Sequence, residues 1–75
     1  MLTLFGTSAC HLCELAEALL HHAGAAFEHV DISESDALFE RYGTTIPVLR
    51  RSDGAELNWP FDQAMLASFL AEGEG

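Results

Sequence analysis

The sequence has no lysine and only three arginines, against twelve aspartates and glutamates among its 75 residues. The resulting formal net charge of −9 argues against a nucleic-acid partner, because binding a phosphate backbone requires clustered Lys and Arg side chains. The same charge disfavours binding to acidic membranes. No apolar run approaches the roughly 18 residues that a membrane-spanning helix needs, so no membrane span is predicted.

A secretory signal is also missing, because the N-terminus has no basic segment and its apolar run ends at Phe5. We therefore expect a protein of the reducing cytoplasm, where two neighbouring cysteines are more often catalytic or metal-binding than structural. The length predicts a single small domain over residues 1–75, with residues 73–75 as a frayed tail. We expect this domain to be a monomer.

The only two cysteines, Cys10 and Cys13, lie between a short apolar run and a helical pattern. Residues 2–5 predict a buried strand, and residues 6–8 have the composition of a turn. A helix is predicted from about residue 10 to residue 23. Its apolar positions follow helical spacing, namely Leu12, Leu15, Ala16, Leu19, Leu20 and Ala23.

Cys10 is thereby predicted at or near a helix N-terminus. Unpaired N–H groups and the helix dipole stabilise negative charge there, so a thiolate is favoured over a thiol. Cys13 lies almost one turn later on the same side of the helix and can close a disulfide after Cys10 has reacted. An attacking thiol and a resolving thiol are what thiol–disulfide exchange requires.

Residues 26–32 predict a second strand, and the strand–helix–strand order favours a parallel pair with a right-handed crossover. A short helix is expected over residues 35–42, with Ser33 or Ser35 as its N-cap and Gly43 at its end. Its inward stripe is predicted to consist of Leu38, Phe39 and Tyr42.

Pro47 is expected to open a third strand, and Asp53-Gly54 to connect that strand to a fourth. Pro60 suits the first turn of a last helix. The predicted inward residues of that helix are Phe61, Met65, Leu66, Phe69 and Leu70. The order β-α-β-α-β-β-α predicts an α/β fold in which three helices flank a four-stranded mixed sheet.

A C-x-x-C pair at a strand-to-helix turn, with Thr45-Ile46-Pro47 before the third strand, resembles the thioredoxin superfamily and specifically its glutaredoxin branch. Residues 57–61 look like those of short bacterial glutaredoxin-like proteins, and the resemblance extends from Leu2 to about Leu70. It implies that Cys10 attacks a substrate disulfide and that Cys13 resolves the mixed disulfide. It also implies that Pro47 is cis and faces the dithiol, with the Ile46 backbone offered to the substrate.

The sequence departs from the commoner glutaredoxins between the cysteines and near the last helix. His11-Leu12 replaces the usual Pro-Tyr or Gly-Pro, so His11 is either a thiolate-stabilising group or an exposed residue of the first turn. No Lys or Arg precedes Cys10, and Glu14 follows Cys13. The Gly-Gly-x-Asp stretch that helps glutaredoxins hold glutathione is replaced by residues 58–62, which weakens the implied glutathione specificity.

The main hypothesis is a thiol–disulfide oxidoreductase of cell redox homeostasis with weak glutathione dependence and no cofactor. Its expected partners are protein disulfides or a thioredoxin-type reductase, with glutathione as a further co-substrate candidate. Beside the catalytic Cys10 and Cys13, the candidate substrate-binding residues are His11, Leu12, Arg41, Thr45, Ile46, Pro47, Trp59, Phe61 and Asp62.

Two alternatives stay open at the level of the sequence. One is a binding module that has kept the fold but lost turnover. The other is a metal site at the C-x-x-C pair, completed by further ligands from His11, His21, His22 and His29. The absence of a second C-x-x-C pair disfavours the metal site, and the helix dipole accounts for His21 and His22 in the last helical turn.

Overall fold

The computed structural model describes residues 2–7 and 10–72. Its elements follow the predicted order, with one additional 3₁₀ helix, η1. They are β1 (Leu2–Gly6), α1 (His11–His22), β2 (Phe27–Asp31), η1 (Ile32–Glu34), α2 (Asp36–Tyr42), β3 (Val48–Arg50), β4 (Glu56–Asn58) and α3 (Gln63–Glu72). The predicted tail at 73–75, and residues 8 and 9 beside the predicted turn, lie outside the described residues.

The four strands form one mixed sheet in the order β2-β1-β3-β4. β1 runs parallel to β2, as the strand–helix–strand order predicts, and antiparallel to β3. β3 and β4 form the expected antiparallel hairpin, in which Gly54 has a φ of 94°. A side chain is strained at such a positive φ, which explains the glycine in this turn.

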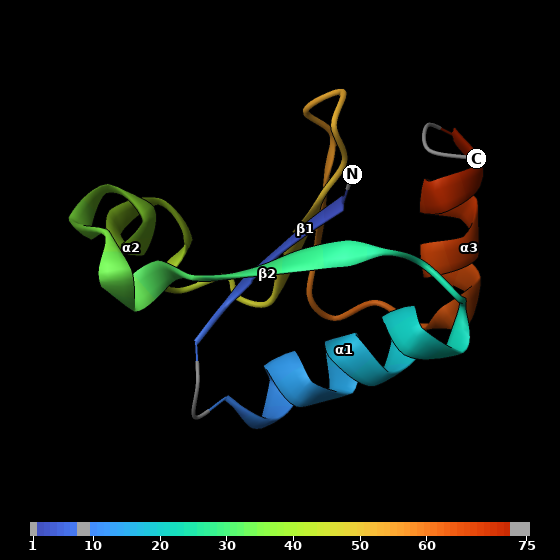
Figure 1. Ribbon diagram of the computed structural model, residues 1–75, viewed down its shortest axis with the longest axis horizontal. Helices are drawn as coiled ribbons and strands as arrows, with labels where there is room; N and C mark the ends of the chain where they lie inside the picture. Colours follow the sequence, from blue (N-terminus) through green and yellow to red (C-terminus); the bar gives the residue numbers. More distant parts are fainter. Residues whose placement is uncertain (1, 8–9, 73–75) are drawn as a thin grey trace.

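The helices lie on both faces of the sheet (Figure 1). Along β1, Leu2 and Leu4 point into a core that they share with residues of α1 and α3. Phe5 points to the opposite face, because successive strand side chains alternate. There it packs in a second core with Ile32, Tyr42 and Val48, and the rings of Phe5 and Tyr42 stack with centroids 4.5 Å apart.

Residues that flank the helices satisfy the backbone groups at several helix ends. Ser35 is the N-cap of α2, and its hydroxyl accepts a hydrogen bond from the Leu38 N–H. Gly24, with a φ of 70°, follows the last turn of α1. The start of α3 was predicted too early, because Pro60 precedes the helix. The carboxylate of Asp62 instead accepts a hydrogen bond from the Met65 N–H at 2.8 Å and caps the helix.

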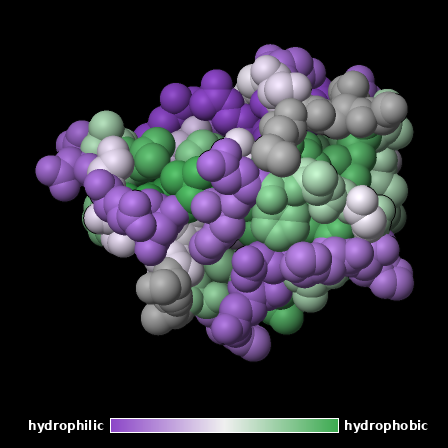
Figure 2. Space-filling view, viewed as in Figure 1, coloured by the Kyte–Doolittle hydropathy of each residue, from purple (hydrophilic) through white to green (hydrophobic). Residues whose placement is uncertain are grey.

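Four apolar residues that were predicted to point inward are exposed: Leu12, Leu15, Phe39 and Met65. The buried stripe of α1 runs instead through Cys13, Ala16 and Leu20, so the helix is rotated relative to the predicted face. In the short helix α2, Tyr42 fills the position against the sheet and leaves Phe39 57% exposed. Viewed from the side of Figure 1, hydrophobic side chains gather in the middle of the surface between hydrophilic margins (Figure 2). None of the helices in the described ranges has the length and apolarity that a membrane span needs.

Candidate functional site

The Cys10 sulfur lies at the N-terminus of α1. Cys10 is the N-cap residue, and its Sγ accepts a hydrogen bond from the Cys13 N–H at 3.2 Å. Its carbonyl accepts the Glu14 N–H, which closes the first helical turn. Cys10 is partly exposed and carries a free thiol. The backbone therefore presents an N–H donor and the positive end of the helix dipole to a sulfur that solvent can reach.

The Cys13 sulfur has the opposite environment. Cys13 is 1% exposed, and burial raises the pKa of its thiol from 9.0 to about 11. The hydrogen bond with Cys10 and the negative charges of Cys10 and Glu17 contribute to this rise to a lesser degree than burial, whereas the Thr7 N–H acts in the other direction. Cys13 is therefore a protonated thiol at neutral pH, even though it lies one turn from Cys10.

Gly6, the last residue of β1, allows Cys13 to lie directly against the sheet. A β-carbon on Gly6 would lie 2.7 Å from the Cys13 Sγ and 3.2 Å from the Nε2 atom of His29. Real β-carbons do not make contacts as short as the first of these, so only glycine fits between the strand and the sulfur. The sequence identified Gly6 only as a turn residue and His29 only as a possible metal ligand, since nothing near them in the chain indicates this contact.

Pro47 reaches the same end of the sheet from β3. The Ile46–Pro47 peptide bond is cis, as the resemblance implied. Because Phe5 pairs with Val48 in the antiparallel register, Pro47 lies next to Gly6, where the chain leaves β1 for the cysteines. Pro47 is buried and Ile46 is half-buried. The exposed Thr45 donates its hydroxyl hydrogen bond to the Tyr42 carbonyl.

The segment before α3 carries Trp59 and Phe61, the two aromatic residues that were predicted to bind substrate. Phe61 is 4% exposed and belongs to the core beside α1, while Trp59 is half-buried against that core and meets Phe61 edge to face. The backbone N–H of Trp59 donates a hydrogen bond to the Pro47 carbonyl at 3.1 Å, which connects this segment to the Pro47 loop. A second cis peptide bond, Trp59–Pro60, was not predicted. At the start of α3, the Asp62 carboxylate accepts the Met65 N–H and so occupies the helix N-terminus.

Arg41 lies on the last turn of α2, on the face of the sheet opposite to α1. Its guanidinium lies 5.1 Å from the centroid of the Tyr42 ring and 3.7 Å from the carboxylate of Glu56 on β4. The Tyr42 hydroxyl donates to the same carboxylate. These contacts leave Arg41 engaged away from Cys13, which packs on the face that carries α1.

His11 and Leu12, between the two cysteines, are exposed, and the His11 Nδ1 lies 3.7 Å from the Glu14 carboxylate. His21 meets Phe27 edge to face near the other end of α1. Over residues 2–7 and 10–72, no three His, Cys, Asp or Glu side chains are grouped so that they could hold a metal ion.

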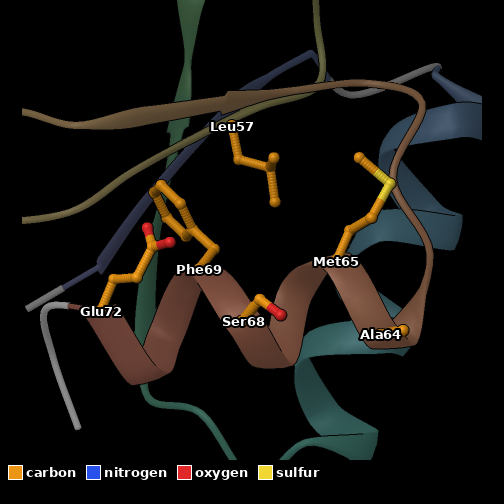
Figure 3. Close-up of a pocket in the computed structure, with 6 residues that line it drawn as sticks. All are labelled: Leu57, Ala64, Met65, Ser68, Phe69 and Glu72. Atoms are coloured by element: carbon orange, nitrogen blue, oxygen red, sulfur yellow. The ribbon is translucent and has the colours of Figure 1, made fainter.

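An apolar groove lies apart from the cysteines, between β4 and α3. It is lined by Leu57, Ala64, Met65, Ser68, Phe69 and Glu72 (Figure 3). None of these residues was predicted to take part in the function.

Comparisons with known proteins agree with this arrangement. The family model described as a glutaredoxin-like domain (DUF836) matches residues 1–71. The chain belongs to this glutaredoxin-like family. Membership supports a redox-type function of the thioredoxin superfamily, consistent with two free thiols one helical turn apart.

Solved structures show the same fold. The crystal structure of target protein XcR50 from X. campestris has 43% sequence identity and a TM-score of 0.93, covering 97% of this chain and 99% of that one. A solution structure of XcR50 gives 42% identity and a TM-score of 0.88, with coverages of 96% and 94%. Protein Ne2328 from Nitrosomonas europaea has 26% identity and a TM-score of 0.77, with coverages of 91% and 87%. None of the curated proteins matches. The glutaredoxin-like domain therefore has the α/β thioredoxin-like fold that the sequence predicted.

Proposed function

We propose that this glutaredoxin-like domain is a thiol–disulfide oxidoreductase in which Cys10 attacks and Cys13 resolves. The observation that carries the proposal is the difference between the two sulfurs. The Cys10 Sγ is partly exposed and accepts an N–H hydrogen bond at the helix N-terminus, whereas Cys13 is buried and holds its proton. Nucleophilic attack requires a thiolate that substrate can reach, so Cys10 takes the first step.

The reaction then proceeds in two exchanges. The Cys10 thiolate attacks one sulfur of a substrate disulfide, forms a mixed disulfide, and releases the other substrate sulfur as a thiolate that takes up a proton. Cys13 next loses its proton and attacks the Cys10 sulfur. The bond between Cys10 and the substrate breaks, the Cys10–Cys13 disulfide forms, and the second substrate thiol leaves. The dithiol is oxidised by two electrons and the substrate disulfide is reduced by two.

Protein disulfides are the proposed substrates, with a thioredoxin-type reductase as the partner that restores the dithiol. The half-buried Ile46 and Trp59 offer apolar surface at the Pro47 loop, and the exposed Leu12 offers apolar surface between the two cysteines. An extended substrate segment would use such a surface beside the cysteines. The formal charge of −9 favours neutral or basic partners through long-range attraction.

Glutathione is proposed to be a poor co-substrate. It is a net anion, and the two groups best suited by charge to receive its carboxylates, Arg41 and the N-terminus of α3, have other partners. Arg41 is engaged by Glu56, and the N-terminus of α3 is capped by Asp62. Turnover of a glutathionylated substrate as fast as by an ordinary glutaredoxin would contradict this part of the proposal.

Trapping of the mixed disulfide tests the assignment of the two thiols. Cys13→Ser should retain the attack by Cys10 and accumulate a covalent adduct with a disulfide-containing protein such as insulin, detected by mass spectrometry. Cys10→Ser should form no adduct and show no insulin reduction. An adduct at Cys13 in the Cys10→Ser variant, equal in rate to that at Cys10, would reverse the roles. Adduct formation without turnover in the wild type would identify a binding module.

A further inference from the structure

We propose that His29 accepts the proton of Cys13 in the resolving step. This inference rests on the proposed function, because it concerns the second of the two exchanges. His29 lies on β2, outside the C-x-x-C segment and the Pro47 loop, and its imidazole reaches the position where Cys13 packs against the sheet.

The sheet register places His29 on the correct face. His29 pairs with Leu4 in the parallel β1–β2 ladder, and Gly6 lies two residues further along β1 on the same face. The His29 Nε2 lies 3.2 Å and the Cys13 Sγ 2.7 Å from the position of a β-carbon on Gly6. The nitrogen and the sulfur are therefore no more than about 6 Å apart, a separation that one water molecule can bridge. A side chain on Gly6 would fill the space between them.

The resolving step needs such an acceptor. Cys13 is almost fully buried, and burial holds its pKa near 11, so very little thiolate forms spontaneously at neutral pH. A neutral imidazole can take the proton as the thiolate forms, and it is the side chain best suited to that exchange near pH 7.

Charged groups of α1 and β2 act on the two residues. On α1, the carboxylate of Glu17 acts on Cys13 and opposes a negative charge on its sulfur. On β2 itself, the pKa of Asp31 is lowered, mainly by hydrogen bonds from the hydroxyl and N–H of Ser33 and to a smaller extent by the positive charge of His29. From the start of α1, the Cys10 sulfur also faces Cys13, and in the mixed disulfide it carries no charge.

The resolving step moves one proton and exchanges one disulfide bond. The proton moves from the Cys13 Sγ to the His29 Nε2, and the Cys13 thiolate attacks the Cys10 sulfur of the mixed disulfide. The substrate leaves as a thiolate and takes up the proton from the imidazolium, directly or through solvent. His29 returns to its neutral form, and no further oxidant or reductant is needed.

The experiment uses the reduced full chain and the aromatic disulfide DTNB, followed by stopped-flow absorbance of the released thionitrobenzoate. Attack by Cys10 releases the first equivalent, and resolution by Cys13 releases the second. His29→Gln is compared with His22→Gln, a matched change at an exposed histidine in the last turn of α1. Glu17→Gln tests the competing acceptor.

We expect His29→Gln to leave the first phase unchanged and to slow the second phase at least about tenfold at pH 7. The rate of the wild-type second phase should depend on pH in a way that His29→Gln abolishes, because only the neutral imidazole accepts a proton, and His22→Gln should behave as wild type. An unchanged second phase in His29→Gln, or slowing in Glu17→Gln alone, would overturn the role of His29 and leave the proposed function intact. A wild-type protein that releases only one equivalent would instead overturn the proposed function.

Discussion

The two ends of the sheet bury polar side chains in opposite ways. At the end away from the cysteines, Arg51 is only 8% exposed, yet its guanidinium is fully engaged. It donates two hydrogen bonds to Asp53 and one to the Phe69 carbonyl at 2.7 Å, and it lies over the Phe69 ring. At the other end, Cys13 is even more deeply buried, and the groups that shift the pKa of its thiol are another thiol, one N–H group and like charges.

The difference in partners gives the two buried groups different roles: Arg51 stabilises the fold, and Cys13 is a reactive group. A buried charge with a carboxylate, a carbonyl and an aromatic face around it has no tendency to change its ionisation, and it holds the hairpin to α3. A buried thiol without a cation holds its proton strongly, so that a base is needed before it reacts. Burial therefore stabilises the fold at one end and controls the order of the reaction at the other.

Removing the buried contacts of Arg51 should have the largest effect on stability. Arg51→Met keeps much of the side-chain volume but removes the donor to the Phe69 carbonyl and the two guanidinium donors to the Asp53 carboxylate. We expect the melting temperature to fall by about 10 °C, measured by circular dichroism, with the first DTNB phase unchanged. Arg51→Lys keeps the charge but loses the paired N–H donors of the guanidinium, so its melting temperature should lie between those of wild type and Arg51→Met. A melting temperature equal to wild type in Arg51→Met would remove the distinction between the two ends.

A side chain placed against the Cys13 sulfur should have the next largest effect on stability. In Gly6→Ala, the new methyl group would lie 2.7 Å from the Cys13 sulfur, so either the sulfur or the strand must move. We expect a loss of about 1–3 kcal/mol in the free energy of unfolding and a slower second DTNB phase.

Gly24→Ala is the matched control for that change. Gly24 has a positive φ and no atoms within 4 Å of an added β-carbon, so alanine there strains the backbone without touching the site. It should lower stability and leave both DTNB phases unchanged. Equal slowing of the second phase in the two variants would show that general destabilisation, and not crowding, controls Cys13.

The buried thiol should also make stability depend on pH. The folded protein holds the Cys13 proton up to a pKa of about 11, against an ordinary value of 9.0. The stabilisation is therefore complete below pH 9.0 and is lost as the pH rises toward 11. Urea unfolding of the reduced wild type and of Cys13→Ala should converge over this range. The comparison between the two proteins cancels the contribution of Tyr42, whose pKa is also raised by burial. A constant difference across the range would contradict the environment assigned to Cys13.

The smallest effect is expected at Asp62, an exposed acceptor at the start of α3. Asp62→Ala removes the cap and should lower the free energy of unfolding by about 1 kcal/mol, measured in urea. Asp62→Asn retains an oxygen acceptor and should remain close to wild type. If Asp62→Asn were destabilised as much as Asp62→Ala, the negative charge rather than the hydrogen bond would hold this helix end.

The sequence by itself determined the order of the elements and the position of Cys10. Apolar spacing, the serine before α2 and the glycines at residues 24 and 54 act through neighbours close in the chain, so they can be recognised without the fold. The C-x-x-C pair at a strand-to-helix turn and the Thr45-Ile46-Pro47 segment were enough to suggest the family and the cis bond at Pro47.

Tertiary structure alone decided which side chains meet. A helical stripe indicates that α1 has a buried side, but packing on the sheet selected Cys13, Ala16 and Leu20 and left Leu12 and Leu15 exposed. The contact of Gly6, Cys13 and His29 depends on strand register and on how closely α1 approaches β1, and the burial of Arg51 depends on where the end of α3 lies. These relations join residues from separate elements, and the distances that decide them are set by the packing of the whole chain rather than by any local pattern.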